Sequence, residues 1–425
     1  MIDIKLIREN PQKFKDAAKA KHFDVDIDKL IEIDQALKAT KQKLQVITTD
    51  KNQIGKSIPR LANDEKQTAM AQLADLKQQQ ADYDEQIKQL QPLFDDLILH
   101  VAQPADDDVP LGADDTQNVE IRKEGQIPQF DFELADHVQL GLDLGIIDIE
   151  RGVKLAGTRN YFLKGDGALL HWAVLRFAVD LMVKRGYVPM SVPLLVRDAT
   201  MQGTAYFPGG EDQAYRMKKD QLNLVGTAEV PLTAYHMGEI LNEEQLPLKY
   251  VGLSTCFRRE AGAAGKDTYG LYRIHQFDKV EQVVVCRNDP EQSMKFHSEI
   301  LSNAEAVMQA LKLPYRIVNV CTGDLGRGQA KKFDIEAWMP SRKNYCETHS
   351  ASKFYDFQAR RMNLRYKETA TKKNIFCHTL NNTVIASPRV LIPLLELYQN
   401  PDGSINIPEV LQPYMNNKQK ITKPT

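Results

Sequence analysis

The sequence predicts an α+β protein in which a mainly antiparallel sheet with flanking helices follows an N-terminal antiparallel helical hairpin. Three observations support this prediction. Residues 27–101 place apolar side chains at alternating steps of three and four residues. Two later runs, LKYVGLSTCFRRE and YRIHQFDKVEQVVV, are rich in strand-forming residues and are joined by a glycine-rich loop. The rest shows no regular alternation of strand and helix signals.

The predicted hairpin consists of two helices that share one apolar seam. Between them, GKSIPRLANDEK contains Gly55, Pro59 and Asn63-Asp64, which indicate a turn. A central turn favours pairing within one chain, and a coiled coil between two chains remains the alternative. The seam positions are Leu30, Ile33, Leu37, Thr40, Leu44, Ile47, Lys51 and Ile54 in the first helix, and Leu73, Leu76, Gln80, Tyr83, Ile87, Leu90, Phe94, Leu97 and Val101 in the second.

The elements after the hairpin are expected to form a second domain. Residues 102–125 predict a linker and a short strand, and the apolar stripe over 169–181 predicts a helix that ends at Gly186. The run YVPMSVPLLV then predicts a strand, and helix signals return over 289–311 and after Pro388. We therefore expect domains at 1–110 and 111–425.

Bulk composition limits the possible partners. A formal net charge of −2 over 425 residues gives no global electrostatic case for a nucleic-acid partner, so a local patch would have to hold one. The five cysteines lack the spacing of a zinc ribbon or a disulfide framework, which favours a reducing cytoplasm. The charged start and the lack of a long apolar window predict neither a signal peptide nor a membrane span.

Charged and aromatic side chains gather on one face of the predicted β-hairpin. Period two places Phe277, Lys279 and Glu281 on one side of the second strand, and Arg258 and Glu260 share a side of the first. One interpretation is a solvated face with salt bridges. The other is a site for a polyanion that carries a flat base, with arginines for phosphate and an aromatic ring for stacking. The pattern alone does not separate them.

Other signals for phosphate or acid–base chemistry are weak. The sequence has no Walker A lysine loop, and the glycine-rich run 323–328 departs from the dinucleotide fingerprint, which favours a turn. His275 could act as a base, but packing is the more common role for a lone histidine.

The run FRREAGAAGKDTYGLYRIHQFDKVE, residues 257–281, is very similar to motif 2 of the bacterial-type seryl-tRNA synthetases, a class II family. GYVPMSVP, with Pro193, resembles motif 1 near 168–195, and HTLN begins the segment that resembles motif 3 near 381–399. TAEVPLT (227–233) looks like the serine-binding strand of this family, and DFQARR and DGSINIPEVLQPYM also match. The N-terminal hairpin corresponds to the tRNA-binding arm, so the resemblance spans nearly the whole chain.

The resemblance implies ATP, Mg²⁺, serine and the tRNA for serine as ligands, and a homodimer that pairs through motif 1. Arg258 would hold the α-phosphate, while Arg273 and Arg389 would hold the γ-phosphate end of a bent ATP. The resemblance assigns catalysis to Arg258 and Arg389, ATP binding to Arg258, Arg259, Glu260, Arg273, Phe277, Glu347, Ser350 and Arg389, serine binding to Thr227, Ala228, Glu229, Arg258, Glu281, Asn381 and Thr383, and Mg²⁺ binding to Glu347 and Ser350.

Departures from the family pattern cluster near the implied amino-acid site. Gly226 replaces a proline, Thr383 lies where Gly-Ser-Gly is usual, and Pro388 replaces a glycine. The segment 347–354 carries His349, Lys353 and Phe354 in place of small or polar residues. We expect Ser387 to cap the last long helix, with Pro388 at its first position, and Pro393 to kink it and shift Arg389.

The hairpin also departs from a typical phosphate-binding surface. Residues 29–96 carry ten Lys and Arg against eleven Asp and Glu, a net charge of −1, which weakens the expected tRNA contact.

The leading hypothesis is a serine–tRNA ligase. The alternatives are a divergent paralog that activates serine or another small amino acid for a different acceptor, and a non-catalytic synthetase-like dimer that acts as a binding module.

Overall fold

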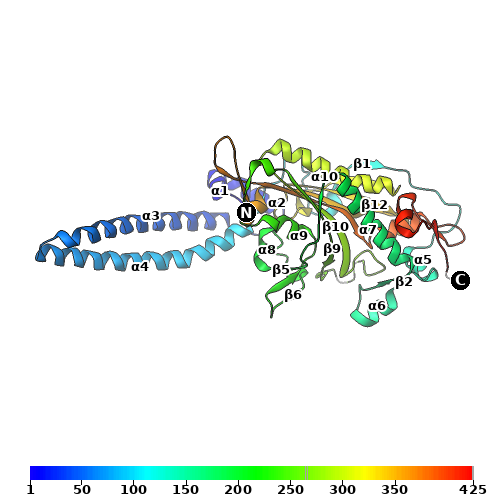
Figure 1. Cartoon of the computed structure of the whole chain (residues 1–425), viewed down its shortest axis with the longest axis horizontal. Helices are drawn as coiled ribbons and strands as arrows, with labels where there is room; N and C mark the ends of the chain where they lie inside the picture. The colour runs from blue at the N-terminus through cyan, green and yellow to red at the C-terminus, as the bar shows by residue number, and fades with distance from the viewer. Residues whose placement is uncertain (264, 266, 424–425) are drawn as a thin grey trace. The chain divides into compact units, whose positions relative to one another are not determined.

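The computed structural model describes residues 1–263, 265 and 267–423, so Ala264 and Lys266 of the predicted glycine-rich loop lie outside the described residues. The chain forms two compact units, Met1–Pro104 and Ala105–Thr425 (Figure 1). The division falls before the expected boundary at 110. Residues 105–110 belong to the second unit, where Asp106 pairs with Lys353 at 2.5 Å and Asp108 pairs with Lys331.

The first unit is helical, and polar residues set where its helices begin. Asp3 accepts a hydrogen bond from Lys5 N at 2.9 Å, and Asp26 accepts one from Lys29 N at 2.8 Å, so each satisfies a free N–H at a helix start. Asn10 plays the same role for a helix whose first residue is Pro11. The helices are α1 (Ile4–Glu9), α2 (Pro11–Ala20), α3 (Ile27–Ser57) and α4 (Asn63–His100).

Helices α3 and α4 form the predicted antiparallel hairpin. Every predicted seam position on either helix is buried or partly buried, whereas most positions between them are exposed. Lys41 Nζ donates to Gln91 Oε1 at 2.8 Å, and Lys43 Nζ lies 5.7 Å from the centre of the Tyr83 ring across the hairpin. The turn is shorter than predicted, because α3 continues past Gly55 and α4 already begins at Asn63.

An eight-stranded sheet forms the centre of the second unit, and only its β4–β9 pair is parallel. The mainly antiparallel prediction is therefore confirmed, as is the short strand after the linker, which pairs with β11. The strands, in spatial order, are β1 (Val119–Glu124), β11 (Tyr315–Asn319), β12 (Lys331–Met339), β13 (Asn344–Tyr355), β16 (His378–Ser387), β10 (Gln276–Cys286), β9 (Leu248–Phe257) and β4 (Val188–Met190).

Smaller sheets and helices surround the main sheet. The short strands are β2 (Ile147–Asp148) with β3 (Phe162–Leu163), β5 (Leu195–Arg197) with β7 (Leu222–Leu224) and β6 (Arg216–Met217), β8 (Ile240–Asn242) with β14 (Arg365–Lys367) and β15 (Asn374–Phe376), and β17 (Ile405–Asn406) with β18 (Lys420–Ile421). The helices are α5 (His137–Asp143), α6 (Ile149–Ala156), α7 (Asp166–Lys184), α8 (Asp198–Gly203), α9 (Glu229–Thr233), α10 (Pro290–Ala310), α11 (Phe357–Met362) and α12 (Leu391–Leu397).

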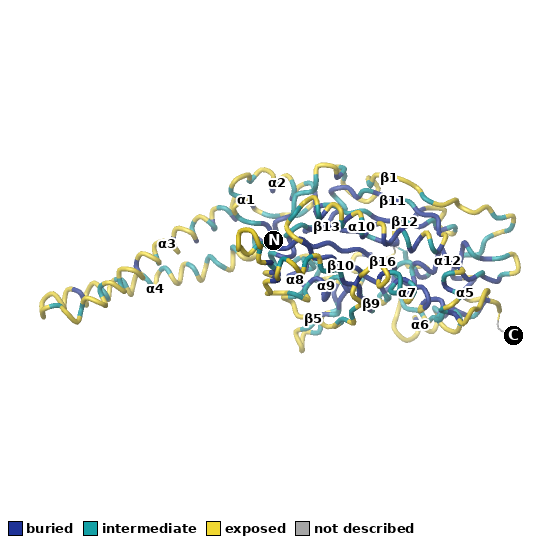
Figure 2. The backbone as a smooth tube through the Cα atoms, turned by 45° about the horizontal axis from the view of Figure 1, so that its top comes forward, coloured by how far each residue is buried: buried dark blue, intermediate teal, exposed yellow. Residues whose placement is uncertain are grey.

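The two faces of the main sheet have different partners. Val280 and Val284 of β10 join the large apolar core that includes residues of α7 and α10, and the central strands β13, β16 and β10 are mostly buried (Figure 2). Alternation then turns the odd-numbered residues of β10 to the opposite face, where Val283 packs with α9 and α11. Phe277, Lys279 and Glu281, which are also odd-numbered, lie on that second face.

Three local predictions were wrong. YVPMSVPLLV forms two short strands, β4 and β5, in different sheets. TAEVPLT forms helix α9 after a turn at Thr227 and Ala228, not a strand. Ser387 is the last residue of β16 and not a helix cap; Pro388 follows it through a cis peptide bond.

Helix α12 begins only at Leu391, which changes the effect of Pro393. This proline occupies the third helical position, where a backbone N–H has no partner within the helix, so the predicted kink does not arise. None of the helices in the described part of the chain is both long enough and apolar enough to cross a membrane.

Candidate active site

A cavity of about 230 Å³ opens on the sheet face opposite α7 and α10. Strands β10, β13 and β16 supply much of its lining, and the segments that follow β9 and β16 supply its arginines. The lining residues are Tyr206, Glu229, Arg258, Glu260, Leu271, Tyr272, Arg273, Ile274, Phe277, Lys279, Glu281, Gln329, Glu347, Thr348, Ser350, Ser352, Asn381, Thr383, Ala386, Ser387 and Arg389.

Arg258 joins the aromatic and the cationic parts of this cavity. Its guanidinium lies 5.2 Å from the centre of the Phe277 ring, and its Nε donates to the carbonyl of Gly226 at 3.3 Å. Burial disfavours its charge, but Tyr206, Cys256 and Glu347 nearby keep the pKa of Arg258 above its ordinary value. A partly buried, fixed cation beside an aromatic ring suits a phosphate joined to a flat base.

A second group of arginines lies around Tyr272. Arg389 Nε donates to the Tyr272 carbonyl at 3.1 Å, and its guanidinium lies 4.4 Å from the centre of the Tyr272 ring. Arg389 also donates to the Glu347 carbonyl at 3.0 Å, and Arg273 donates to Glu260 Oε2 at 2.8 Å. These hydrogen bonds hold the guanidinium groups of Arg389 and Arg273 in fixed orientations without a ligand.

A buried polar cluster on β10 and β16 lines another part of the cavity. Glu281 is 1% exposed and forms an ion pair with Lys279 on the same strand face. Thr227 Oγ1 lies 3.4 Å from Glu281 Oε2, and Thr383 Oγ1 lies 3.5 Å from the same atom. Because Lys279 Nζ also reaches Thr383 Oγ1 at 3.3 Å, a small hydroxyl placed here would meet donors and acceptors together.

Glu229 and Asn381 add two further polar groups with unused capacity. Burial and the nearby charge of Glu281 raise the pKa of Glu229 to about 7, although Lys279 and a hydrogen bond from Gln358 oppose this shift. Gln358 Nε2 donates to Glu229 Oε1 at 3.0 Å. Asn381 Nδ2 is buried and has no hydrogen-bond partner at ordinary geometry, although it lies near enough to Glu229 to oppose the rise in that pKa. Glu229 suits the ammonium group of a ligand, whereas the free N–H of Asn381 suits a hydrogen-bond acceptor such as a carboxylate oxygen.

Comparisons with known proteins agree with this geometry. Residues 1–103 match the model of the seryl-tRNA synthetase N-terminal domain, and residues 214–398 match that of the tRNA synthetase class II core domain (G, H, P, S and T). The serine–tRNA ligase of Deinococcus radiodurans is 43% identical over 424 residues, which is 100% of both chains. That of Nitrosopumilus maritimus is 38% identical and covers 99% of this chain and 100% of its own. The chain belongs to the seryl-tRNA synthetase family.

A solved member of the family has the same fold. The seryl-tRNA synthetase from Pyrococcus horikoshii, a structure complexed with ATP, superimposes with a TM-score of 0.93 at 35% identity and covers 100% of both chains. The expected class II fold is thereby confirmed for this chain.

The cavity brings together most residues that the sequence assigned by resemblance to the seryl-tRNA synthetases. Three of them do not line it. Thr227, which contacts Glu281, and Ala228 are both fully buried, whereas Arg259 is exposed and its backbone N–H donates to the Gln213 carbonyl at 2.9 Å. The residues that do line it are Glu229, Arg258, Glu260, Arg273, Phe277, Glu281, Glu347, Ser350, Asn381, Thr383 and Arg389.

Sequence reasoning gave no role to several lining residues. Lys279 was visible as a member of the charged strand face, and its place between Phe277 and Glu281 could have added it to the site. Tyr206 and Gln329 come from loops distant in sequence, so no local pattern identifies them.

Two of the unusual residues of segment 347–354 face away from the cavity. Ser350 and Ser352 line the cavity, so His349 and Lys353 point to the other face of β13, and both are 1% exposed. There His349 bonds to Thr348 Oγ1 at 2.8 Å, and Lys353 pairs with Asp106. The departures of this synthetase at His349 and Lys353 therefore lie behind the sheet and not in the cavity.

The proposed metal site offers few protein ligands. Among the described residues, no cluster of three or more His, Cys, Asp or Glu side chains could hold a metal ion. The Glu347 side chain is 48% exposed. Its partial loss of solvent would raise the pKa of its carboxyl, but the positive charges of Arg389, Lys332 and Arg258 outweigh this and hold the pKa below the ordinary value. One ionised carboxylate beside Ser350 fits Mg²⁺, which usually keeps waters and takes its remaining ligands from substrate phosphates.

Proposed function

We propose that this chain is a serine–tRNA ligase that joins serine to ATP as seryl-adenylate and then transfers serine to tRNA. The observation that carries the proposal is the pairing, within one cavity, of fixed arginines beside an aromatic ring with the buried cluster of Glu281, Lys279 and Thr383. The named relatives are serine–tRNA ligases over their full length, and they give the paralog and binding-module alternatives no support.

The first step requires positioning and charge neutralisation and no general base. An oxygen of the serine carboxylate attacks the α-phosphorus, a new P–O bond forms, and the bond to the pyrophosphate leaving group breaks. Arg258 would hold the α-phosphate, and Arg273 and Arg389 would hold the terminal phosphate. The negative charge that develops on the phosphate oxygens during the reaction would then lie next to fixed cations. Mg²⁺ held by Glu347 and Ser350 would neutralise further phosphate charge.

The polar cluster on β10 and β16 would select serine. Glu281 and Thr383 would hydrogen bond to its hydroxyl, Glu229 would pair with its amino group, and the free Asn381 N–H would donate to an oxygen of its carboxylate. A site built for a hydroxyl rejects the analogue that lacks one, because its buried polar groups then lose their partner.

The test is amino-acid-dependent pyrophosphate exchange with the full chain, followed by charging of tRNA. Serine should support exchange at least about a thousandfold better than alanine. Similar rates with serine and alanine would contradict the specificity. No exchange with any of the twenty amino acids would favour the binding module, and exchange with serine without tRNA charging would favour the paralog.

We further propose that the protein is a cytoplasmic homodimer that binds tRNA through residues 1–110. All five cysteines are free and buried, which suits a reducing compartment. Support for the dimer comes from the motif 1 region, where Trp172 is 61% and Val188 54% exposed. Large apolar side chains left exposed together often mark a protein interface.

A further inference from the structure

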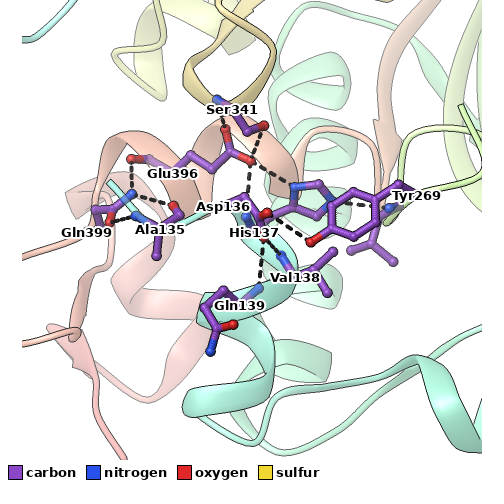
Figure 3. A network of polar contacts seen from close by, with 10 residues as sticks. Ala135, Asp136, His137, Val138, Gln139, Tyr269, Ser341, Glu396 and Gln399 are labelled. Atoms are coloured by element: carbon purple, nitrogen blue, oxygen red, sulfur yellow. Dashed lines mark hydrogen bonds and ion pairs between the residues drawn. The ribbon is translucent and has the colours of Figure 1, made fainter. Parts of the chain in front are cut away.

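A buried histidine–glutamate pair joins α5 to α12 and is surrounded by a network of polar contacts (Figure 3). Glu396 of α12 is 0% exposed, and its carboxylate accepts from His137 Nδ1 at 2.8 Å and from the His137 backbone N–H at 3.1 Å. The Ser341 hydroxyl and backbone N–H also donate to it, at 2.7 and 2.9 Å. These four hydrogen bonds offset the cost of burying the carboxyl and hold it in one position.

The other ring nitrogen of His137 reaches the returning limb of the motif 2 loop. The Leu271 backbone N–H donates to His137 Nε2 at 3.2 Å. Nε2 must therefore be unprotonated, and Nδ1 carries the hydrogen that it donates to Glu396. The ring thus links Glu396 in one direction and the loop in the other, and its tautomer is fixed by both bonds.

This link leads directly to the cationic part of the cavity. Tyr272 follows Leu271, and its carbonyl and ring hold Arg389 at 3.1 and 4.4 Å. Arg389 precedes α12, the helix that carries Glu396. Glu396 is thus linked through His137 to Leu271 and, by the next residue, to Arg389. Arg389 is in turn joined to Glu396 by the chain that forms α12.

A second branch starts from the same carboxylate. Ser341 precedes Arg342, whose guanidinium lies 4.2 Å from the centre of the Tyr272 ring and donates to Asp267 at 2.6 Å. Asp267 is also 3.7 Å from Arg273. Glu396 therefore restrains the neighbours of both arginines at this end of the cavity.

Two features beside His137 show how closely the loop is fitted to it. Gly270 has a φ of +69°, and a Cβ added there would lie 2.1 Å from His137 Nε2, so only glycine fits. The Tyr269 hydroxyl donates to Asp136 Oδ2 at 2.9 Å, while Asp136 Oδ1 caps α5 through Val138 and Gln139.

We propose that His137 and Glu396 are positioning residues that set the motif 2 loop and Arg389 for the triphosphate of a nucleotide. The proposal rests on the proposed function in assigning this part of the cavity to ATP. The pair touches no substrate. It acts by holding Leu271, so that Tyr272 and the two arginines already have their bound directions when the nucleotide arrives.

Two substitutions at one position separate the two bonds of the ring. His137→Asn keeps an N–H near Nδ1 for Glu396 but loses the acceptor for Leu271. His137→Gln puts an amide oxygen near Nε2 and keeps that acceptor, while the link to Glu396 is lost. We expect His137→Asn to raise KM for ATP about tenfold with KM for serine changed less than about twofold. His137→Gln keeps the Leu271 bond but loses the Glu396 bond that orients the side chain, so we expect it to raise KM for ATP by about threefold with KM for serine unchanged.

The thermal midpoint of each variant tests a purely structural role. Such a role predicts a lower midpoint for both variants and no difference between the two KM values. Equal changes in both KM values, or an unchanged KM for ATP in folded His137→Asn protein, would overturn the proposal.

Tyr269→Phe provides a second test if His137→Asn does not fold. The Tyr269 side chain is 62% exposed, so loss of its hydroxyl should leave the fold intact. Because the hydroxyl anchors the same limb to α5, we expect KM for ATP to rise about threefold and KM for serine to stay unchanged. No difference between the two KM values in this variant would count against the proposal.

Calorimetry with ATP–Mg²⁺ alone separates failure of the inference from failure of the proposed function. If wild-type protein activates no serine but binds ATP, and His137→Asn weakens that binding about tenfold, the positioning role stands and the serine–tRNA ligase assignment fails. If serine is activated normally and His137→Asn binds ATP as wild type does, the positioning role fails alone.

Discussion

Arg258 lies where the aromatic and cationic parts of the cavity meet, so its removal tests the nucleotide assignment most directly. Its contact with Phe277 and its bond to the Gly226 carbonyl fix the guanidinium in place. Arg258→Ala should lower serine-dependent pyrophosphate exchange at least about a hundredfold, as loss of a preorganised transition-state partner does. Exchange close to wild type in folded Arg258→Ala protein would remove this residue from the reaction.

Two other arginines serve as comparisons for that variant. Arg287 is exposed and pairs with Glu243 at 3.4 Å outside the cavity, so Arg287→Ala should leave exchange near wild type. Arg259 is adjacent to Arg258 but exposed, so Arg259→Ala should lose much less activity than Arg258→Ala. An equal loss in both would favour the sequence-based assignment of Arg259 to ATP.

The raised pKa of Glu229 predicts a pH dependence for serine use. Burial and Glu281 raise this pKa to about 7, so the carboxyl is protonated below that pH and cannot pair with the ammonium group of serine. The kcat/KM for serine, which reports the free enzyme, should fall up to about tenfold for each pH unit below 7. Glu229→Gln should be a poor enzyme whose remaining kcat/KM changes little over the same range. A wild-type profile that is flat from about pH 6 to 8 would contradict this role.

At the scale of single elements, predictions succeeded where the determining contacts are local. The β9–β10 hairpin follows from the alternation of residues on either side of one loop, and the α3–α4 seam follows from steps of three and four. In both cases neighbouring residues carry the pattern that decides the structure.

The start of α12 shows where such reasoning stops. Pro388 satisfies the local preference for the first helical position, but the chain remains in β16 as far as Ser387 because that residue pairs with Asp278 of β10. The pairing partner lies far away in sequence, so helix signals near Pro388 could not reveal it. The segment 227–233 is a similar case, because its turn and helix α9 pack against β9 and β10, which neighbouring residues in the sequence do not reveal.

The hairpin of α3 and α4 permits a prediction about tRNA use. A variant that lacks residues 1–104 keeps Asp106, the partner of buried Lys353, whereas a cut at 110 would leave that lysine unpaired. All cavity residues lie at Tyr206 or later, so pyrophosphate exchange should survive. Charging of tRNA should fall at least about a hundredfold, because the phosphate contacts assigned to the hairpin are lost.

The salt dependence of charging provides a further check on the hairpin. Residues 29–96 carry ten cations against eleven anions, and Lys41 and Lys43 are partly engaged with Gln91 and Tyr83. We therefore expect the affinity of the full chain for tRNA, measured through charging, to fall only gradually with added salt. Charging that is unchanged after removal of residues 1–104 would show that the assignment of tRNA binding to the hairpin is wrong.

At the scale of the whole molecule, several large apolar side chains of α7, β9 and β4 are exposed. Trp172 and Val183 lie eleven residues apart on α7, which is three helical turns and hence one face, and they are 61% and 44% exposed. Leu253 of β9, a strand that packs against α7, is 44% exposed. Strand β4, which is the edge of the eight-stranded sheet, leaves further backbone and Val188 uncovered.

A second copy of the chain is the partner proposed for this surface, and Trp172 is its largest apolar side chain. Trp172→Glu should weaken the dimer by roughly 2 kcal/mol, about thirtyfold in Kd, because a charge would replace a buried aromatic group at the interface. Leu111→Glu is the matched control: Leu111 is 82% exposed and lies outside motif 1, so the dimer should persist. Light scattering across micromolar concentrations, with exchange assayed on the same samples, measures both quantities. A wild-type protein that is an active monomer at these concentrations would refute the dimer, and the exposed face of α7 would then need another partner.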